Sequence, residues 1–256
     1  MTDLIIDLPL TDDGIIEGPE EFAFGLSNPS TSTGANIGID AISTIVTTTI
    51  NDTQGDGGDT EGPGEWSVTG SSAGDEGSIA QYTVSLSGAY GAGEIITVDL
   101  ELTDVSTNAS DYADIVAAIT DAIDGNPDVT FDPVTGTLSY TAPVDGATMT
   151  DLIIDLPLID DGIIEGPEEF TFGLSNPSTS TGANIGIDAA ATSITTTVND
   201  TQGDGGATEG PGEWSVAGTG AGEEGSTAQY TVSLSGAYGA GAVSYTHLTL
   251  PTILLV

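Results

Sequence analysis

Carboxylates crowd one short stretch of the sequence, IDDGIIEGPEEF at residues 159–170. Its acidic side chains are Asp160, Asp161, Glu165, Glu168 and Glu169, and the chain contains no Lys or Arg to offset them. A hard cation such as Ca²⁺ binds six to eight oxygen ligands and takes them from flexible acidic loops of this kind. The pairing of Asp160 and Asp161 at a strand end, with Glu165 after a turn, therefore predicts a calcium site.

Electrostatic repulsion sets the energy scale of such a stretch. Two carboxylates about 4 Å apart repel each other by about 4 kcal/mol at an effective dielectric near 20. Several such pairs would rival the whole stability of a domain, which is about 5–15 kcal/mol. Mg²⁺ is less favoured because it sheds its water reluctantly, and Zn²⁺ prefers Cys or His ligands. A solvated acidic face without a specific ion remains the alternative, above all for Glu168 and Glu169.

The composition excludes several classes of function. The 256 residues carry 40 Asp and Glu and a formal net charge of −40, which argues against binding to nucleic acid or to anionic membranes. The absence of Cys rules out disulfides and thiol catalysis. No apolar run is long enough to span a membrane. We expect no enzyme activity, because a nucleophile would lack the base that activates it. The number of acids by itself does not exclude a catalytic pair of carboxylates.

The sequence repeats itself at an offset of 148 residues. Residues 1–41 recur at 149–189 with two changes, and a looser match continues to Gly93 and Gly241. Two nearly identical segments rich in Gly and acid predict linkers at 53–64 and 201–212. We therefore expect a complete central unit at 65–200, the second half of a preceding unit at 1–52, and the opening strands of a following unit at 213–242.

Both ends of the sequence indicate a fragment of a longer protein. Met1 aligns with Met149, which lies in a predicted strand, so we interpret Met1 as an internal methionine. The string VSYTHLTLPT at 243–252 resembles the translation of a transposon-end adapter used in DNA sequencing libraries. Residues 243–256 are accordingly expected to be an artefact, which removes His247 from any functional role. A divergent final strand is the alternative.

Alternation of apolar and polar residues predicts the fold. In SIAQYTVSLSG, Tyr82, Val84 and Leu86 share one face, and four other segments of the central unit alternate in the same way. About seven half-buried strands separated by Gly, Pro, Asn and Asp predict an all-β, antiparallel Ig-like β-sandwich. Helical spacing in SDYADIVAAITDAI predicts one short inserted helix at about 112–123, with Ser110 or Asp111 as its N-cap.

These segments resemble a Calx-beta domain, a module of sodium–calcium exchangers, integrin β4 and very large bacterial surface proteins. The resemblance covers nearly the whole repeat, and two features depart from the family: the inserted helix and the absence of Gly before SDY. The matching pieces are DEGSIAQYTVSLSG (75–88), SDY (110–112), TGTLSYTAP (135–143), DDGIIEGPEEFTFGLSNPS (160–178) and ITTTVND (194–200).

The resemblance implies calcium bound by loops at one end of each sandwich. Carried over to this sequence, the ligands of the central unit would be Glu76, Asp111, Asp160, Asp161, Glu165 and Asp200. The matching positions in the two partial units are Asp12, Asp13, Glu17, Asp52 and Glu224.

Together these features predict a calcium-binding tandem β-sandwich. We expect a structural spacer or adhesive stalk of a secreted or cell-surface protein, of bacterial origin. Its partners would be calcium ions, neighbouring repeats of the same chain and an unknown adhesion ligand. Because Asp200 leads directly into a linker, calcium is also expected to stiffen the joint between units. The alternatives are a passive acidic, salt-adapted spacer with no specific ion site, and a ligand-binding adhesin domain.

Overall fold

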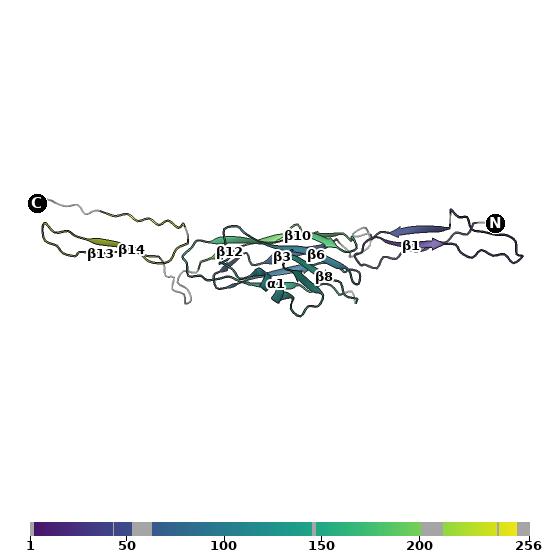
Figure 1. Cartoon of the computed structure of the whole chain (residues 1–256), viewed down its shortest axis with the longest axis horizontal. Coiled ribbons are helices and arrows are strands. Elements are labelled where there is room, and N and C mark those ends of the chain that lie inside the picture. Colours follow the sequence, from purple (N-terminus) through teal and green to yellow (C-terminus); the bar gives the residue numbers. More distant parts are fainter. Residues whose placement is uncertain are drawn as a thin grey trace.

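The computed structural model describes residues 3–42, 44–52, 63–144, 147–200, 212–239 and 241–249. The predicted linkers therefore lie almost entirely outside the described residues, as does the end of the suspected artefact. In the described residues, a β-sandwich lies between two hairpins, one toward each end of the chain (Figure 1). The predicted all-β sandwich with one short helix is confirmed.

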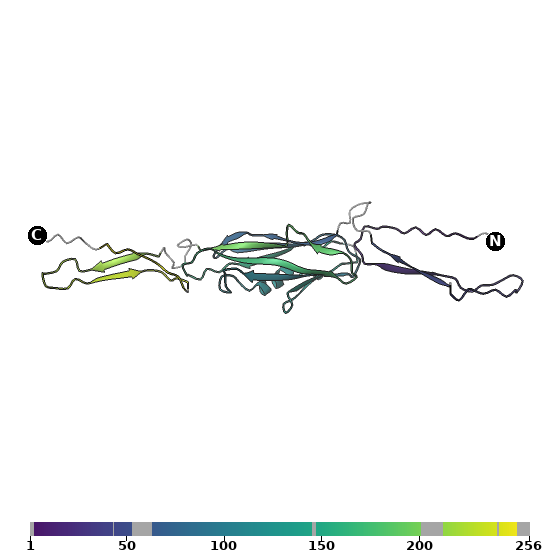
Figure 2. The ribbon, with the colours of Figure 1, turned by 90° about the horizontal axis from the view of Figure 1, so that it is seen from above.

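Two sheets built from the central unit form the sandwich (Figure 2). Their neighbouring strands are antiparallel except for the pairs β4–β12 and β11–β3, which are parallel. The six-stranded sheet has the order β4 (Ala73–Asp75), β12 (Ser193–Asn199), β10 (Glu168–Thr179), β6 (Ile95–Asp104), β8 (Thr137–Thr141), β7 (Val129–Asp132). The four-stranded sheet has the order β11 (Ile185–Ile187), β3 (Gly64–Gly70), β5 (Ile79–Leu86), β9 (Leu152–Pro157).

Aromatic side chains fill the space between the two sheets. Phe170 and Phe172 project from β10 and Tyr82 from β5, and all three are fully buried. The Tyr82 ring lies 5.0 Å from the Phe172 ring, measured between centroids, and Tyr112 lies 5.1 Å from Phe170. The strand alternation read from the sequence thus places these residues in one continuous core.

A buried hydrogen-bond chain joins the sheets across this core. The Thr196 hydroxyl on β12 donates to the carbonyl of Ser71 at 2.7 Å. The Tyr82 hydroxyl lies 2.6 Å from Thr196 Oγ1 and must therefore donate to it. Burial, which outweighs this hydrogen bond, raises the pKa of Tyr82 to about 12. The polar end of Tyr82 is satisfied inside an otherwise apolar layer.

The inserted helix α1 (Ile115–Ile123) begins three residues later than predicted. Asp114 caps it by accepting a hydrogen bond from the Val116 amide at 2.9 Å, so the predicted caps Ser110 and Asp111 are wrong. The reason is pairing with the end of β9. Tyr112 forms a β-bridge with Leu158, and this pairing keeps the residues before the helix extended.

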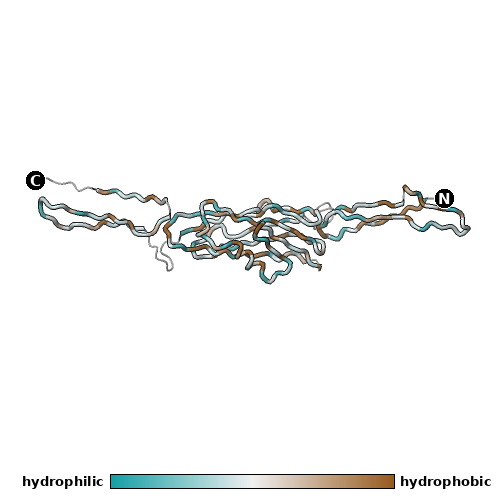
Figure 3. The backbone as a smooth tube through the Cα atoms, in the orientation of Figure 1, coloured by the Kyte–Doolittle hydropathy of each residue, from teal (hydrophilic) through white to brown (hydrophobic). Residues whose placement is uncertain are grey.

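The flanking hairpins repeat parts of the sandwich in the same register. β1 (Glu20–Gly25) pairs with β2 (Ile45–Ile50) as β10 pairs with β12, and β13 (Trp214–Gly218) pairs with β14 (Tyr230–Leu234) as β3 pairs with β5. Their apolar residues appear along the hairpins in Figure 3. Phe24 is 50% exposed, whereas its repeat counterpart Phe172 is 0% exposed. The hairpins thus lack the covering sheet that buries the same residues in the central unit.

Among the described residues, no helix has the length and apolarity that a membrane crossing requires.

The repeat supplies a matched test of the core. Phe172→Ala should lower the free energy of unfolding by about 3–5 kcal/mol, because it leaves a cavity between the sheets. Phe24→Ala, at the equivalent but half-exposed position, should cost well under half as much. Urea unfolding followed by circular dichroism measures both, and equal losses would contradict the sandwich described here.

Candidate metal centre

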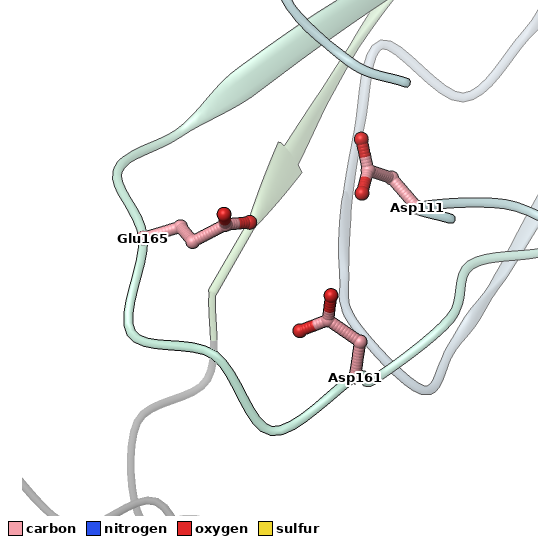
Figure 4. Close-up of side chains that lie close together, drawn as sticks. All are labelled: Asp111, Asp161 and Glu165. Carbon is pink, nitrogen blue, oxygen red and sulfur yellow. The ribbon is translucent and has the colours of Figure 1, made fainter. Parts of the chain in front are cut away.

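Three carboxylates converge at one end of the sandwich. Asp111 lies between β6 and α1, while Asp161 and Glu165 lie in the loop between β9 and β10, called here the acidic loop (residues 160–165). One oxygen of each residue lies within 4.8 Å of the others. Figure 4 shows the three side chains turned toward a common space. Sequence segments about fifty residues apart therefore supply one cluster of oxygen ligands.

Local hydrogen bonds hold Asp111 in position. The Asn108 amide donates to its Oδ2 at 2.6 Å, and Asn108 Nδ2 donates to Oδ1 at 3.3 Å. The backbone amide of Ile159 donates to the carbonyl of Asp111 at 2.9 Å, which ties this segment to the start of the acidic loop. Asp111 is 4% exposed. It is the most deeply buried member of the cluster, although the family motif around it was the least regular.

The acidic loop is shaped by its own side chains. Asp160 and Asp161 each accept a hydrogen bond from the amide two residues ahead, at 3.3 and 2.9 Å. Such Asx turns suit the tight reversal at Gly162, whose φ is +75°. Asp161 joins the cluster, whereas Asp160 lies outside the group of three, although both side chains are exposed.

The last strand anchors the acidic loop from the other side. Asp200 follows β12 directly, and its Oδ2 accepts a hydrogen bond from the Glu165 amide at 2.9 Å. The parallel pairing of β4 with β12 places Glu76 there as well, because the Glu76 amide donates to the carbonyl of Asn199 at 3.0 Å. Both predicted residues thus lie at the same end of the sandwich as the three converging carboxylates.

Glu168 lies at this site, although the sequence analysis did not include it among the ligands and kept a solvated face as the alternative for it. Burial, a hydrogen bond with Asp111 and the charges of the neighbouring acids together raise the pKa of Glu168 to about 7. Strand alternation carried the missed signal, because Glu168 shares its face of β10 with Phe170. Glu169 points the other way and lies 3.5 Å from the Thr197 hydroxyl, as expected of a solvated face.

The pKa of Glu165 is also raised, first by burial and then by the charges of Asp161, Asp111 and Asp200.

The equivalent loop in the preceding unit has the same internal hydrogen bonds. Asp12 and Asp13 again accept from amides two residues ahead, and Asp52 accepts from the Glu17 amide at 2.9 Å.

The partial units nevertheless bring together fewer of their predicted ligands. The residues 3–52 contain no counterpart of Asp111, and Glu224 is exposed in the loop between β13 and β14. Within the described ranges, neither partial unit gathers three converging carboxylates.

Comparison with known proteins gives no family. No protein-family model matches the chain, and no curated protein matches it. A search of solved structures finds the collagen-binding domain of a Staphylococcus aureus adhesin, at 14% identity, 52% coverage of this chain, 96% of that chain and a TM-score of 0.23. It also finds the S. aureus collagen adhesin (CNA), at 12% identity and a TM-score of 0.24, with 75% of this chain and 56% of that chain covered. Likeness at these TM-scores assigns no function, and the Calx-beta resemblance rests on the sequence motifs.

From the raised pKa of Glu168 we predict that the stability of the calcium-free protein depends on pH. Folded Glu168 keeps a proton that the unfolded chain releases, so its stabilising effect is present below pH 4.5 and is lost as pH rises toward 7. Melting temperatures in chelator at pH 5 and pH 8, at equal ionic strength, should therefore fall less steeply in Glu168→Gln than in the chain itself. Glu169→Gln, on the solvated face, is the control and should keep the full slope. Identical slopes in all three proteins would contradict the buried position of Glu168.

Proposed function

We propose that the chain is a tandem β-sandwich that binds calcium at the end of each complete unit. It acts as a structural spacer or adhesive stalk of a secreted or cell-surface protein. The observation that carries this proposal is the convergence of Asp111, Asp161 and Glu165 oxygens within 4.8 Å of one another. The chain has no Lys or Arg that could balance them.

The spacing of these oxygens suits a calcium ion. Oxygens that bind one Ca²⁺ at about 2.3–2.6 Å lie no more than about 5 Å from each other. The chemistry of the ligands is also suitable, because carboxylates are hard donors and the three residues include no nitrogen or sulfur that would favour zinc. Asp200 and Glu76, at the same end, are further candidate ligands.

A bound cation would tie three parts of the unit together. It would link the segment before α1, the acidic loop and, through the hydrogen bond between Asp200 and Glu165, the end of β12. A bound cation would lower the pKa of Glu168, which burial raises first and the hydrogen bond with Asp111 and the neighbouring charges raise further, so Glu168 would release its proton to the solution. Binding at a hundredfold excess over Kd would stabilise the fold by about 2.7 kcal/mol.

Two arguments support a location outside the cell: the resemblance to Calx-beta domains and the calcium concentration found there. Extracellular calcium modules have dissociation constants of about 10⁻⁴–10⁻³ M, which suits the calcium present outside cells. Tandem units that are stiffened by calcium would serve as an extended spacer. The Calx-beta motifs in the central unit support the same assignment.

Calcium should raise the melting temperature of the full chain by several degrees, because the ion binds only the folded unit. Asp111→Asn and Asp161→Asn should each remove most of this increase. Asp121→Asn, an exposed acid on α1, is the control and should keep it. If NaCl at equal ionic strength replaces calcium fully, the passive acidic spacer is the correct function.

Ligand binding by an adhesin domain is the second candidate. The two solved structures described above are a collagen-binding domain of an S. aureus adhesin and the S. aureus collagen adhesin. Collagen serves as a defined first probe of adhesion, tested by surface plasmon resonance of the full chain over immobilised collagen with albumin as the reference. Saturable binding would support an adhesive function, and its absence would remove collagen as the ligand.

A further inference from the structure

The acidic loop of each unit contacts the next unit along the chain. In the first joint, the Ile16 amide donates to the carbonyl of Ala89 at 2.8 Å, and Ile16 forms a parallel β-bridge with Tyr90. Ile16 is 1% exposed, although the segment before it is open to solvent. The second joint has the same contacts, since Ile164 donates to the carbonyl of Ala237 at 2.8 Å and bridges Tyr238. The joint is thus a repeated structural feature.

Glycines allow this close approach. A Cβ atom on Gly88 would lie 2.4 Å from Ile16 Cδ1, and one on Gly18 would lie 2.2 Å from the carbonyl oxygen of Thr181. Either methyl group would push the preceding unit away from the central one. The two units therefore approach each other closely at this joint.

A buried carboxylate lies on the central unit's side of this joint. Glu94 is 4% exposed, and its Oε1 accepts a hydrogen bond from the Thr181 hydroxyl at 2.5 Å. Its Oε2 is buried and has no hydrogen-bond partner among the described residues. A buried charged oxygen is costly unless a partner compensates it. Glu94 Oε2 therefore calls for a positively charged ligand.

Glu17 of the preceding unit faces the same space. A Cβ atom built on Gly91 would lie 3.3 Å from Glu17 Oε1 and 3.9 Å from Glu94 Oε2. Glu17, Glu94 and Glu20 also line one cavity of about 320 Å³ between the two units. Acids from both units thus line one cavity, and a side chain at residue 91 would lie close to the carboxylates of Glu17 and Glu94.

We propose that this space holds a divalent cation of the calcium type, bound between Glu17 and Glu94 and distinct from the cluster around Asp111. The ion supplies the partner that Glu94 Oε2 lacks. Its ligands come from both sides of the joint, so binding fixes the preceding unit against the central one. The site goes beyond the proposed function, because it does not use Asp111 or Asp161.

The second joint provides a contrast within the same chain. The repeat offset places Ala242 at the position that matches Glu94. Glu165 still lies against the next unit there, with its Oε1 2.5 Å from a Cβ built on Gly239. Without the second carboxylate, this joint is not expected to bind a cation between its units.

Isothermal titration of the full chain with CaCl₂ tests the site by counting bound ions. Glu94→Gln should lose one equivalent of calcium relative to the unmodified chain. Gly91→Ala should lose the same equivalent without removing any charge, because its methyl group would lie 3.3 Å from Glu17 Oε1 and 3.9 Å from Glu94 Oε2 and hinder an ion that binds both. Glu101→Gln, an exposed acid on β6, is the charge-matched control and should lose none.

A distance measurement tests the mechanical consequence. The chain has no Cys, so spin labels can be attached at Thr47→Cys in β2 and Val144→Cys in the central unit, both exposed positions. Calcium should narrow the distribution of distances between the labels. The narrowing should disappear in Glu94→Gln and in Gly91→Ala, and persist in Glu101→Gln.

Asp161→Asn separates this inference from the proposed function. This substitution should remove the one equivalent of calcium bound by the Asp111 cluster. Calcium should still narrow the distribution of distances between the spin labels. If Asp161→Asn changes nothing but Glu94→Gln loses an ion, the proposed function fails and the joint site stands. If Glu94→Gln and Gly91→Ala both keep the full calcium count and the full narrowing of the distance distribution, no cation binds beside Glu94 and the inference is overturned.

Discussion

Repulsion between carboxylates that no basic side chain neutralises is the constraint on which the rest of this structure depends. A chain with 40 acids and no Lys or Arg can only balance its charge with protons, backbone amides or ions from solution. All three ways of balancing charge are available at the end of the sandwich that contains Asp111. The raised pKa of Glu168 favours its protonated form, Asp200 accepts an amide hydrogen bond, and oxygens of Asp111, Asp161 and Glu165 lie within 4.8 Å of one another, where a cation would balance them.

The topology of the sandwich concentrates this charge. Parallel pairing of β4 with β12 brings the opening of the unit beside its last strand, and the turn from β9 to β10 lies at the same end. The pairing of Tyr112 with Leu158 then brings Asp111 to the acidic loop. A cation bound there would therefore join the beginning, middle and end of one unit. The acidic loop also contacts the next unit, so the site and the joint share one short segment.

Much of the fold could be predicted from the sequence, because burial on one face of a strand leaves a period of two. That period correctly placed Tyr82, Val84 and Leu86 on one buried face. The start of α1 was missed, since pairing with the end of β9 overrides the helical spacing before Asp114. The inward position of Glu168 was missed for a different reason. The neighbouring acids were treated as one charged run, although Glu168 lies on the same face of the strand as Phe170.

Other features of the sites depend on contacts that no local pattern contains. The position of Asp111 beside Asp161 follows from tertiary pairing across about fifty residues, and only the family motif suggested it. The burial of Ile16 requires the neighbouring unit, because the residue has no covering sheet within its own hairpin. Glu94 appears in the sequence as one acid among many, and only its buried environment distinguishes it.

The most direct measurement of the central claim is a crystal structure of the chain in saturating calcium, with anomalous difference density collected for the metal. The account predicts an anomalous peak about 2.3–2.6 Å from oxygens of Asp111, Asp161 and Glu165. Separated carboxylates with only water between them, and no anomalous peak at that end of the sandwich, would contradict it.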